Sequence, residues 1–290
     1  MLTVQGWAQG PAAYDKDSLI GGGAMLRLVS RQFSFTEGAA VDRKGNVFFT
    51  DQPNNKIWEY TVDGRLVLFL DSAGRSNGMY FDRKGRLVTC ADDRGQLWEI
   101  GKGKKVTILL QGIGGKPMNG PNDLWMDAKG GIYFTDPYYQ RSYWTRTHSE
   151  LDGEKVYYLP VGGKEAVPVV EDMKKPNGIV GTPDGRYLYV SDLGAGKTYK
   201  YPIGAGGILQ DKQLFVNQGS DGMTLDERGN VYLTGNGVTV YNPNGQPIAH
   251  IPVPEKWTGN LCFGGQDRKS LFITASEGIY VLPMRVRGVE

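Results

Sequence analysis

The hydrophobic pattern of the chain is a short strand, a tight turn and a second short strand. In residues 220–234 it places apolar residues alternately with polar ones on both sides of a turn: Met223, Leu225, Val231 and Leu233. A period of two is typical of strands that bury one face. The turn, residues 226–229, ends in a glycine, which adopts a positive φ at little cost. The segment therefore predicts a β-hairpin.

The same pattern is found in five further segments, residues 36–50, 76–90, 121–135, 176–191 and 259–274. The turn glycine stands at positions 45, 85, 130, 185 and 229, and Arg268 takes its place in the last copy. The copies follow one another at steps of about 40 to 55 residues, the size of a propeller blade. Two more strand-like runs follow each of the first five copies. We therefore expect an all-β fold, a six-bladed β-propeller with four-stranded antiparallel blades.

The sixth unit lacks one strand. Only the run 278–282 follows its hairpin, and then a basic tail, residues 283–290. A spare strand-like run, residues 25–33, precedes the first copy. We predict that this N-terminal strand completes the last blade and closes the ring, which removes an open sheet edge. Residues 24–290 then form a single propeller domain, and residues 1–23 form an N-terminal extension.

Eight positions before each turn position stands a side chain that carries oxygen: Glu37, Asn77, Asn122, Asn177, Asp221 and Asn260. The constant offset places these side chains at one height on equivalent strands, so strands around one axis would form a polar ring at one channel mouth. Buried polar groups need partners, which either water or a metal can supply. Two carboxylates among neutral amides match the charge of one divalent cation. Oxygen ligands favour Ca²⁺, with Zn²⁺, Mn²⁺, Mg²⁺ and Fe²⁺ as alternatives.

The loops after the second strand of each hairpin lie on the same face as this ring. One of them, residues 136–153, is long and carries four aromatic residues, two arginines and His148. Such a loop over a polar ring is typical of a lid or a substrate wall. The alternative is an extension that packs on the neighbouring blade and binds nothing.

Composition excludes several classes of function. The net charge is +2 and no basic run occurs, so neither nucleic acid nor a membrane is an expected partner. The N-terminus lacks the features of a signal peptide, and we expect a cytoplasmic or periplasmic protein, monomer or dimer. Cys90 and Cys262 stand in separate units, which disfavours a disulfide. A Gly-x-Ser-x-Gly motif, a P-loop and a histidine near a repeat tip are all absent.

The repeat tips resemble a known family. Glu37-Gly38, Pro121-Asn122-Asp123, Pro176-Asn177-Gly178 and Ser220-Asp221-Gly222 are similar to the metal-site motifs of the gluconolactonase / senescence marker protein (regucalcin) family. The resemblance covers the chain from about residue 25. It implies a six-bladed propeller with one divalent metal that hydrolyses sugar lactones. By resemblance, Glu37, Asn122, Asn177 and Asp221 are the metal ligands, and Asp221 or Asp123 is the catalytic base. Mammalian members carry an arginine where this chain has Gly120, and Arg75, Arg141 or Arg146 could replace it.

The hypothesis from the sequence is a metal-dependent lactonase that opens sugar lactones. The cation polarises the lactone carbonyl, and a carboxylate activates the attacking water. The expected substrate contacts come from the ring and the loops around it: Asn77, Asn260, Arg75, Tyr138, Tyr139, Trp144 and Arg146. Two alternatives stay open, a phosphotriesterase-like hydrolase with the same cation and a non-catalytic calcium-binding propeller.

Overall fold

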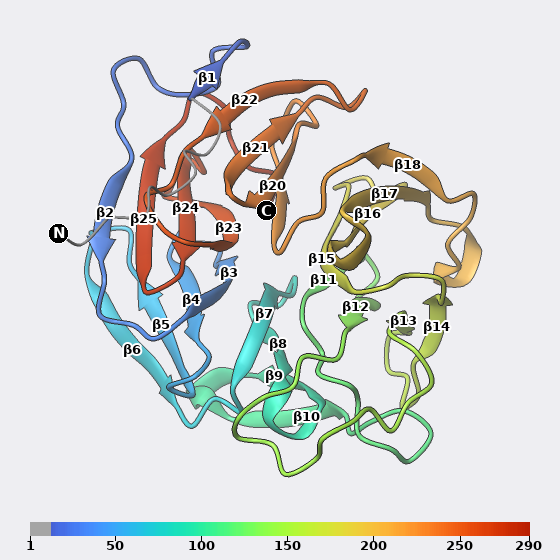
Figure 1. Ribbon diagram of the computed structural model, residues 1–290. Helices are drawn as coiled ribbons and strands as arrows, with labels where there is room; N and C mark the ends of the chain where they lie inside the picture. Colours follow the sequence, from blue (N-terminus) through green and yellow to red (C-terminus); the bar gives the residue numbers. More distant parts are fainter. Residues whose placement is uncertain (1–12) are drawn as a thin grey trace, which may run out of the picture.

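The computed structural model describes residues 13–290, and these form six small sheets arranged around one axis (Figure 1). Neighbouring strands in every sheet are antiparallel, which confirms the six-bladed β-propeller. The first three blades comprise β3 (Thr36–Val41), β4 (Val47–Asp51), β5 (Lys56–Tyr60) and β6 (Leu66–Asp71); β7 (Ser76–Phe81), β8 (Leu87–Ala91), β9 (Gln96–Ile100) and β10 (Val106–Leu110); and β11 (Leu124–Met126), β12 (Ile132–Asp136), β13 (Lys155–Leu159) and β14 (Val167–Val170).

The last three blades follow the same order around the axis. They comprise β15 (Pro176–Gly181), β16 (Tyr187–Asp192), β17 (Lys197–Pro202) and β18 (Gln213–Val216); β19 (Met223–Leu225), β20 (Val231–Gly235), β21 (Gly237–Tyr241) and β22 (Pro247–Ile251); and β23 (Thr258–Gly264), β24 (Ser270–Ala275) and β25 (Gly278–Pro283). Four short 3₁₀ helices lie in connections, at Asp92–Arg94, Lys102–Lys104, Leu193–Ala195 and Ala205–Gly207. Among the described residues no helix is long and apolar enough to cross a bilayer.

The repeated turn is held by its own aspartate. In the first blade the Oδ1 atom of Asp42 accepts hydrogen bonds from the backbone N–H groups of Lys44 and Asn46, at 2.8 and 2.9 Å. Asp226 repeats this arrangement in the fifth blade with Arg228 and Asn230. Asx turns of this kind compensate the backbone groups that a tight turn leaves without ladder partners. The motif therefore fixes where each first hairpin reverses.

The ring closes as the sequence predicts. The strand β2 (Arg27–Ser30), shorter than the predicted 25–33, pairs with β25 and completes the sixth blade. The strand β1 (Tyr14–Asp15) pairs with β22 and gives the fifth blade a fifth strand. It covers His250, which is buried and donates to or accepts from Thr239. Residues 13–23 of the expected extension thus lie on the outside of the ring, and residues 1–12 lie outside the described part.

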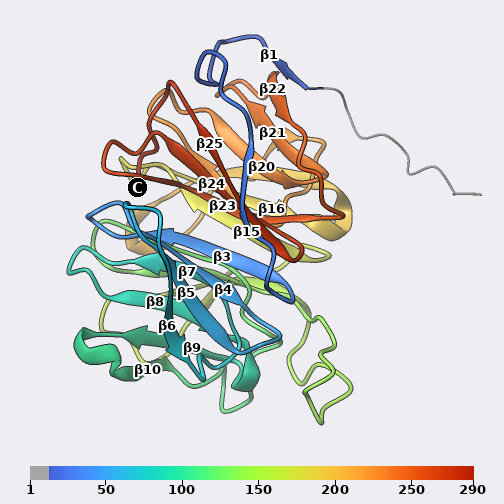
Figure 2. The same ribbon diagram turned by 90° about the vertical axis from the view of Figure 1, so that its left-hand side faces the viewer.

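The C-terminal segment enters the channel at the end opposite the ring (Figures 1 and 2). The backbone N–H groups of Gly288 and Val289 donate to the carbonyls of Arg268 and Leu225. The Thr224 hydroxyl donates to the Glu290 carboxylate at 3.2 Å. The pattern of residues 283–290 predicted only a tail, because these contacts depend on where the finished ring places its axis.

The core lies between neighbouring blades. Phe49 of the first blade packs on Phe272 of the sixth, with ring centroids 5.5 Å apart, and both side chains are buried. Cys90 and Cys262 are free and fully buried, which confirms that they form no disulfide. Apolar burial of this kind is the main stabilising contribution to such a fold.

Candidate active site

All six ring side chains are buried at the inner ends of the blades. Glu37, Asn77, Asn177 and Asn260 stand in the innermost strands, while Asn122 and Asp221 stand two residues before theirs. In more than one blade, a threonine hydroxyl on the second strand accepts a hydrogen bond from the backbone of the tip. Thr135 accepts from the N–H of Asp123 at 3.1 Å, and Thr274 accepts from that of Asn260 at 2.8 Å. The tips are therefore held by backbone contacts, and five of the six ring side chains line a common pocket.

Glycines let the tips of neighbouring blades approach closely. The N–H of Gly78 donates to the carbonyl of Asn122 in the next blade at 2.7 Å, and a Cβ on Gly78 would lie 2.3 Å from Asp123 Oδ1. Gly222 donates to Gly259 at 2.7 Å in the same way. No larger residue fits these positions without displacing the next blade.

Five of the six ring residues line one pocket of about 260 Å³. Its wall is completed by residues from the loops, so that the lining comprises Phe35, Glu37, Gln52, Asn77, Asn122, Tyr139, Arg141, Asn177, Leu193, Asp221 and Trp257. This volume is slightly below that of typical ligand pockets, which start at about 300 Å³, so the cavity is a small one. Polar groups from five blades and the long loop thus converge on a single small cavity.

Glu37 and Asp221 both line this pocket and lie near enough for each carboxylate to shift the pKa of the other. Burial raises the pKa of Glu37 well above its ordinary value, and the Asp221 charge adds to the effect. Burial also raises the pKa of Asp221, while a hydrogen bond from the Trp257 indole, 2.6 Å long, lowers it. Two buried carboxylates at such a distance disfavour each other's charged form. A cation between them would relieve that repulsion.

Asn177 provides independent support for a cation. Its Oδ1 atom is buried and has no hydrogen-bond partner in the described part of the chain, whereas its Nδ2 donates to the Tyr139 hydroxyl at 3.1 Å. A buried carbonyl oxygen without a partner is costly. Within residues 13–290 no three His, Cys, Asp or Glu side chains gather at a metal-binding distance, so acids alone do not make a site. Two acids with amide oxygens form a donor set that fits a hard divalent cation.

Two predicted residues at the blade tips, Asp123 and Asn260, lie outside the pocket lining. The carboxylate of Asp123 accepts backbone hydrogen bonds from Leu124 at 2.9 Å and Ile179 at 3.4 Å, and burial raises its pKa to about 8. Asn260 turns its Oδ1 to the N–H of Leu261 at 2.8 Å. The roles of Asp123 as base and Asn260 as substrate contact stay predictions.

The long loop between β12 and β13 projects from the face that carries the ring (Figure 2). Tyr139 and Arg141 bring it to the pocket, so part of the loop is a pocket wall. Tyr138, Trp144 and Arg146 are not in the lining and contact one another, with the Arg146 guanidinium 3.9 Å from the Trp144 ring centroid. Arg75 likewise lies outside the lining, over the ring of Tyr143. The substrate contacts predicted for these four stay predictions.

The sequence analysis did not name four of the lining residues, Phe35, Gln52, Leu193 and Trp257, and it named Arg141 only as one of three possible arginines. Phe35 and Trp257 stand just before innermost strands, while Gln52 and Leu193 stand just after second strands. These positions flank the hairpins that carry the ring. Their distance from the hairpin along the sequence therefore indicates how high they lie along the channel axis. It does not indicate where their side chains point.

Comparison with known proteins places the chain among lactonase-related propellers. A gluconolactonase of Zymomonas mobilis is 25% identical over 295 residues, which cover 91% of this chain and 82% of the relative. The lactonase drp35 of Staphylococcus saprophyticus is 26% identical over 250 residues, 80% of this chain and 74% of the relative.

Solved structures agree with this placement. A gluconolactonase from Xanthomonas campestris superposes with a TM-score of 0.85 at 27% identity, covering 96% of this chain and 98% of its own. Regucalcin from Agrobacterium tumefaciens, a calcium-binding protein, has the same fold, with a TM-score of 0.78 at 20% identity over 91% of this chain and 95% of its own. Residues 35–277 match the family described as SMP-30/Gluconolactonase/LRE-like region, and the chain therefore belongs to this family.

Proposed function

We propose that the protein is a metal-dependent hydrolase that opens sugar lactones. The observation that carries the proposal is the pocket that Glu37 and Asp221 both line, beside the unpartnered Asn177 Oδ1. The gluconolactonase and lactonase relatives support a lactone as the substrate class.

Glu37, Asn122, Asn177 and Asp221 would hold the metal. The bound cation, Ca²⁺ in the first instance, supplies a Lewis acid that polarises the lactone carbonyl. The calcium-binding regucalcin supports the choice of ion by analogy only, because the likeness is one of fold. The amide oxygens of the two asparagines add ligands without adding negative charge.

Asp221 is the better placed of the two candidate bases, because it lines the pocket and Asp123 does not. Trp257 fixes one Asp221 oxygen through its indole N–H. The Asp221 carboxylate takes a proton from a water molecule as that water attacks the carbonyl carbon. The bond between this carbon and the ring oxygen breaks, and the ring oxygen receives the proton. The product is the open hydroxy acid.

A panel of lactones tests the proposal. Wild-type protein should open δ-gluconolactone in a proton-release assay, lose the activity with a chelator and regain it on addition of Ca²⁺. Asp221→Asn should lose at least about a hundredfold in kcat, since base and ligand are removed together. Turnover of phosphotriesters without lactones would replace the proposal by a phosphotriesterase. Calcium binding without any turnover would leave a binding protein.

A further inference from the structure

The aspartates that end the second strands of two blades bind the backbone of a neighbouring loop, but the buried Asp92 of the second blade does not. Asp51 and Asp192 end the second strands of the first and fourth blades and accept backbone hydrogen bonds from the loop before the first strand, Asp51 from Ser34 and Asp192 from Lys174. The strand pairing places Ala91 at this position in the second blade. Asp92, one residue further on, does not occupy the position that binds this loop backbone, and its carboxylate binds side chains instead.

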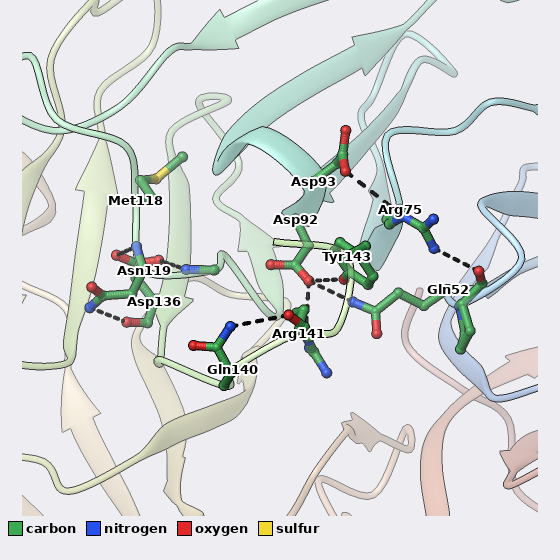
Figure 3. A network of polar contacts seen from close by, with 12 residues as sticks. Gln52, Arg75, Asp92, Asp93, Met118, Asn119, Asp136, Gln140, Arg141 and Tyr143 are labelled. Atoms are coloured by element: carbon green, nitrogen blue, oxygen red, sulfur yellow. Dashed lines mark hydrogen bonds and ion pairs between the residues drawn. The ribbon is translucent and has the colours of Figure 1, made fainter. Parts of the chain in front are cut away.

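Asp92 is the centre of a side-chain network beside the pocket (Figure 3). Its Oδ2 atom accepts hydrogen bonds from Gln52 Nε2 at 3.1 Å, Arg141 Nε at 3.0 Å and the Tyr143 hydroxyl at 2.5 Å. The side chain of Asp92 is 1% exposed, whereas Gln52 and Arg141 line the pocket. A buried carboxylate is stable only when it is paired, so this network fixes the two pocket residues in place.

Of the three arginines near the pocket, Arg141 is the one that lines it. Arg75 binds the Pro53 carbonyl through Nη1 at 2.6 Å. Arg146 binds the carbonyls of Met118 and Asn119 through both terminal nitrogens. Arg141 uses Nε for Asp92, and its terminal nitrogens make no hydrogen bond in the described part of the chain.

Gly120 packs closely against this network. A Cβ on Gly120 would lie 2.7 Å from Asp92 Oδ1 and 3.0 Å from the Trp144 ring. No side chain fits at that position without displacing Asp92 or Trp144, and the guanidinium that lines the pocket is that of Arg141, from the loop between β12 and β13. The Gln52 Oε1 atom makes no hydrogen bond within residues 13–290 either. Together, Arg141 offers donors and Gln52 offers an acceptor, which are the two partners a hydroxyl needs.

We propose that Arg141 and Gln52 form a subsite for the hydroxyl groups of a neutral, polyhydroxylated lactone, and that Asp92 and Tyr143 position Arg141. The inference rests on the proposed function. The charge of Arg141 is already matched by Asp92, and the expected cation is matched by Glu37 and Asp221. The pocket therefore has no surplus positive charge for a substrate that carries a carboxylate.

The test compares two six-membered lactones. δ-Gluconolactone carries ring hydroxyls, and δ-valerolactone has the same ring without them. Arg141→Met should raise KM for δ-gluconolactone at least about tenfold, the usual loss for a hydrogen bond to a charged group. It should change kcat/KM for δ-valerolactone less than about threefold. Arg94→Met, the same change at an exposed arginine two residues after Asp92, should leave both unchanged.

Asp92→Asn tests the positioning role. It should raise KM for δ-gluconolactone as Arg141→Met does, and the double variant should lose no more than either single one. Wild-type protein should also prefer δ-gluconolactone over glucarolactone, which carries a free carboxylate. Equal losses on both six-membered lactones, no loss on either, or a preference for glucarolactone would overturn the subsite. If wild-type protein opens none of these lactones, the proposed function fails and the subsite fails with it.

Discussion

At the scale of single residues, the hydrogen bond from Trp257 to Asp221 decides how the pocket presents its carboxylate. The indole N–H lies 2.6 Å from Asp221 Oδ2 and lowers a pKa that burial raises. Hydrogen bonds to charged groups contribute about 1.5–3 kcal/mol. The indole thus favours the ionised form of Asp221 and holds the carboxylate in one orientation.

Trp257→Phe should lower kcat/KM for δ-gluconolactone about tenfold or more, because the ring is kept and only the donor is lost. Steady-state kinetics measure the effect. Trp58→Phe is the matched control, since the Trp58 indole nitrogen is buried without a hydrogen-bond partner. Equal activities of the two variants would mean that the indole N–H does not orient Asp221.

At the scale of the element, the contact between neighbouring innermost strands determines the width of the channel. Gly78 lies against Asn122 and Asp123 of the next blade, and a Cβ there would meet Asn122 O at 2.7 Å. Interiors are packed too densely to accept an added methyl group at that distance. Two blades would have to separate, and their tip side chains with them.

Gly78→Ala should destabilise the fold by about 1–3 kcal/mol, the usual cost of overpacking, and should also weaken calcium binding. Urea denaturation measures the stability, and calorimetric titration with Ca²⁺ measures the binding. Gly101→Ala is the control, because the nearest atom to its added Cβ is 3.8 Å away. Wild-type stability in Gly78→Ala would contradict the close approach.

At the scale of the whole molecule, the C-terminal segment makes the two ends of the channel different. The pocket opens at one end, and residues 288–290 contact the innermost strands of the fifth blade at the other. Burial raises the pKa of the Glu290 carboxyl to about 7. The folded state therefore holds a proton that the unfolded state releases. The resulting stability is fully present below about pH 4.5 and is lost as the pH rises through about 7.

Glu290→Gln should remove the loss of folding stability that the wild type shows as the pH rises. The variant should exceed the wild type in free energy of unfolding by up to about 3 kcal/mol at pH 8, and by much less at pH 5. Urea midpoints at the two pH values give the difference. Glu277→Gln, at an exposed position, should follow the wild type. An advantage of Glu290→Gln that is the same at both pH values would contradict the raised pKa.

The fold could be predicted because the repeated hairpin is local. Alternating apolar residues, an aspartate that holds its own turn and a fixed offset to the tip all act within about fifteen residues. The run 25–33 was found as the missing strand because closure of the ring requires one. Of the six ring positions, Asn260 shows the limit, since its height follows from the offset but its amide bonds Leu261 rather than lining the pocket.

The sequence alone determined the number of blades, the closure of the ring and the positions that carry oxygen at one mouth, because each depends on a periodic pattern. Only the tertiary structure decided that Arg141, rather than Arg75 or Arg146, reaches the pocket, that Trp257 holds Asp221, and that Glu290 lies half-buried in the channel. These contacts join residues far apart in the chain, and their directions depend on loop paths that are fixed only when the blades have packed around a common axis.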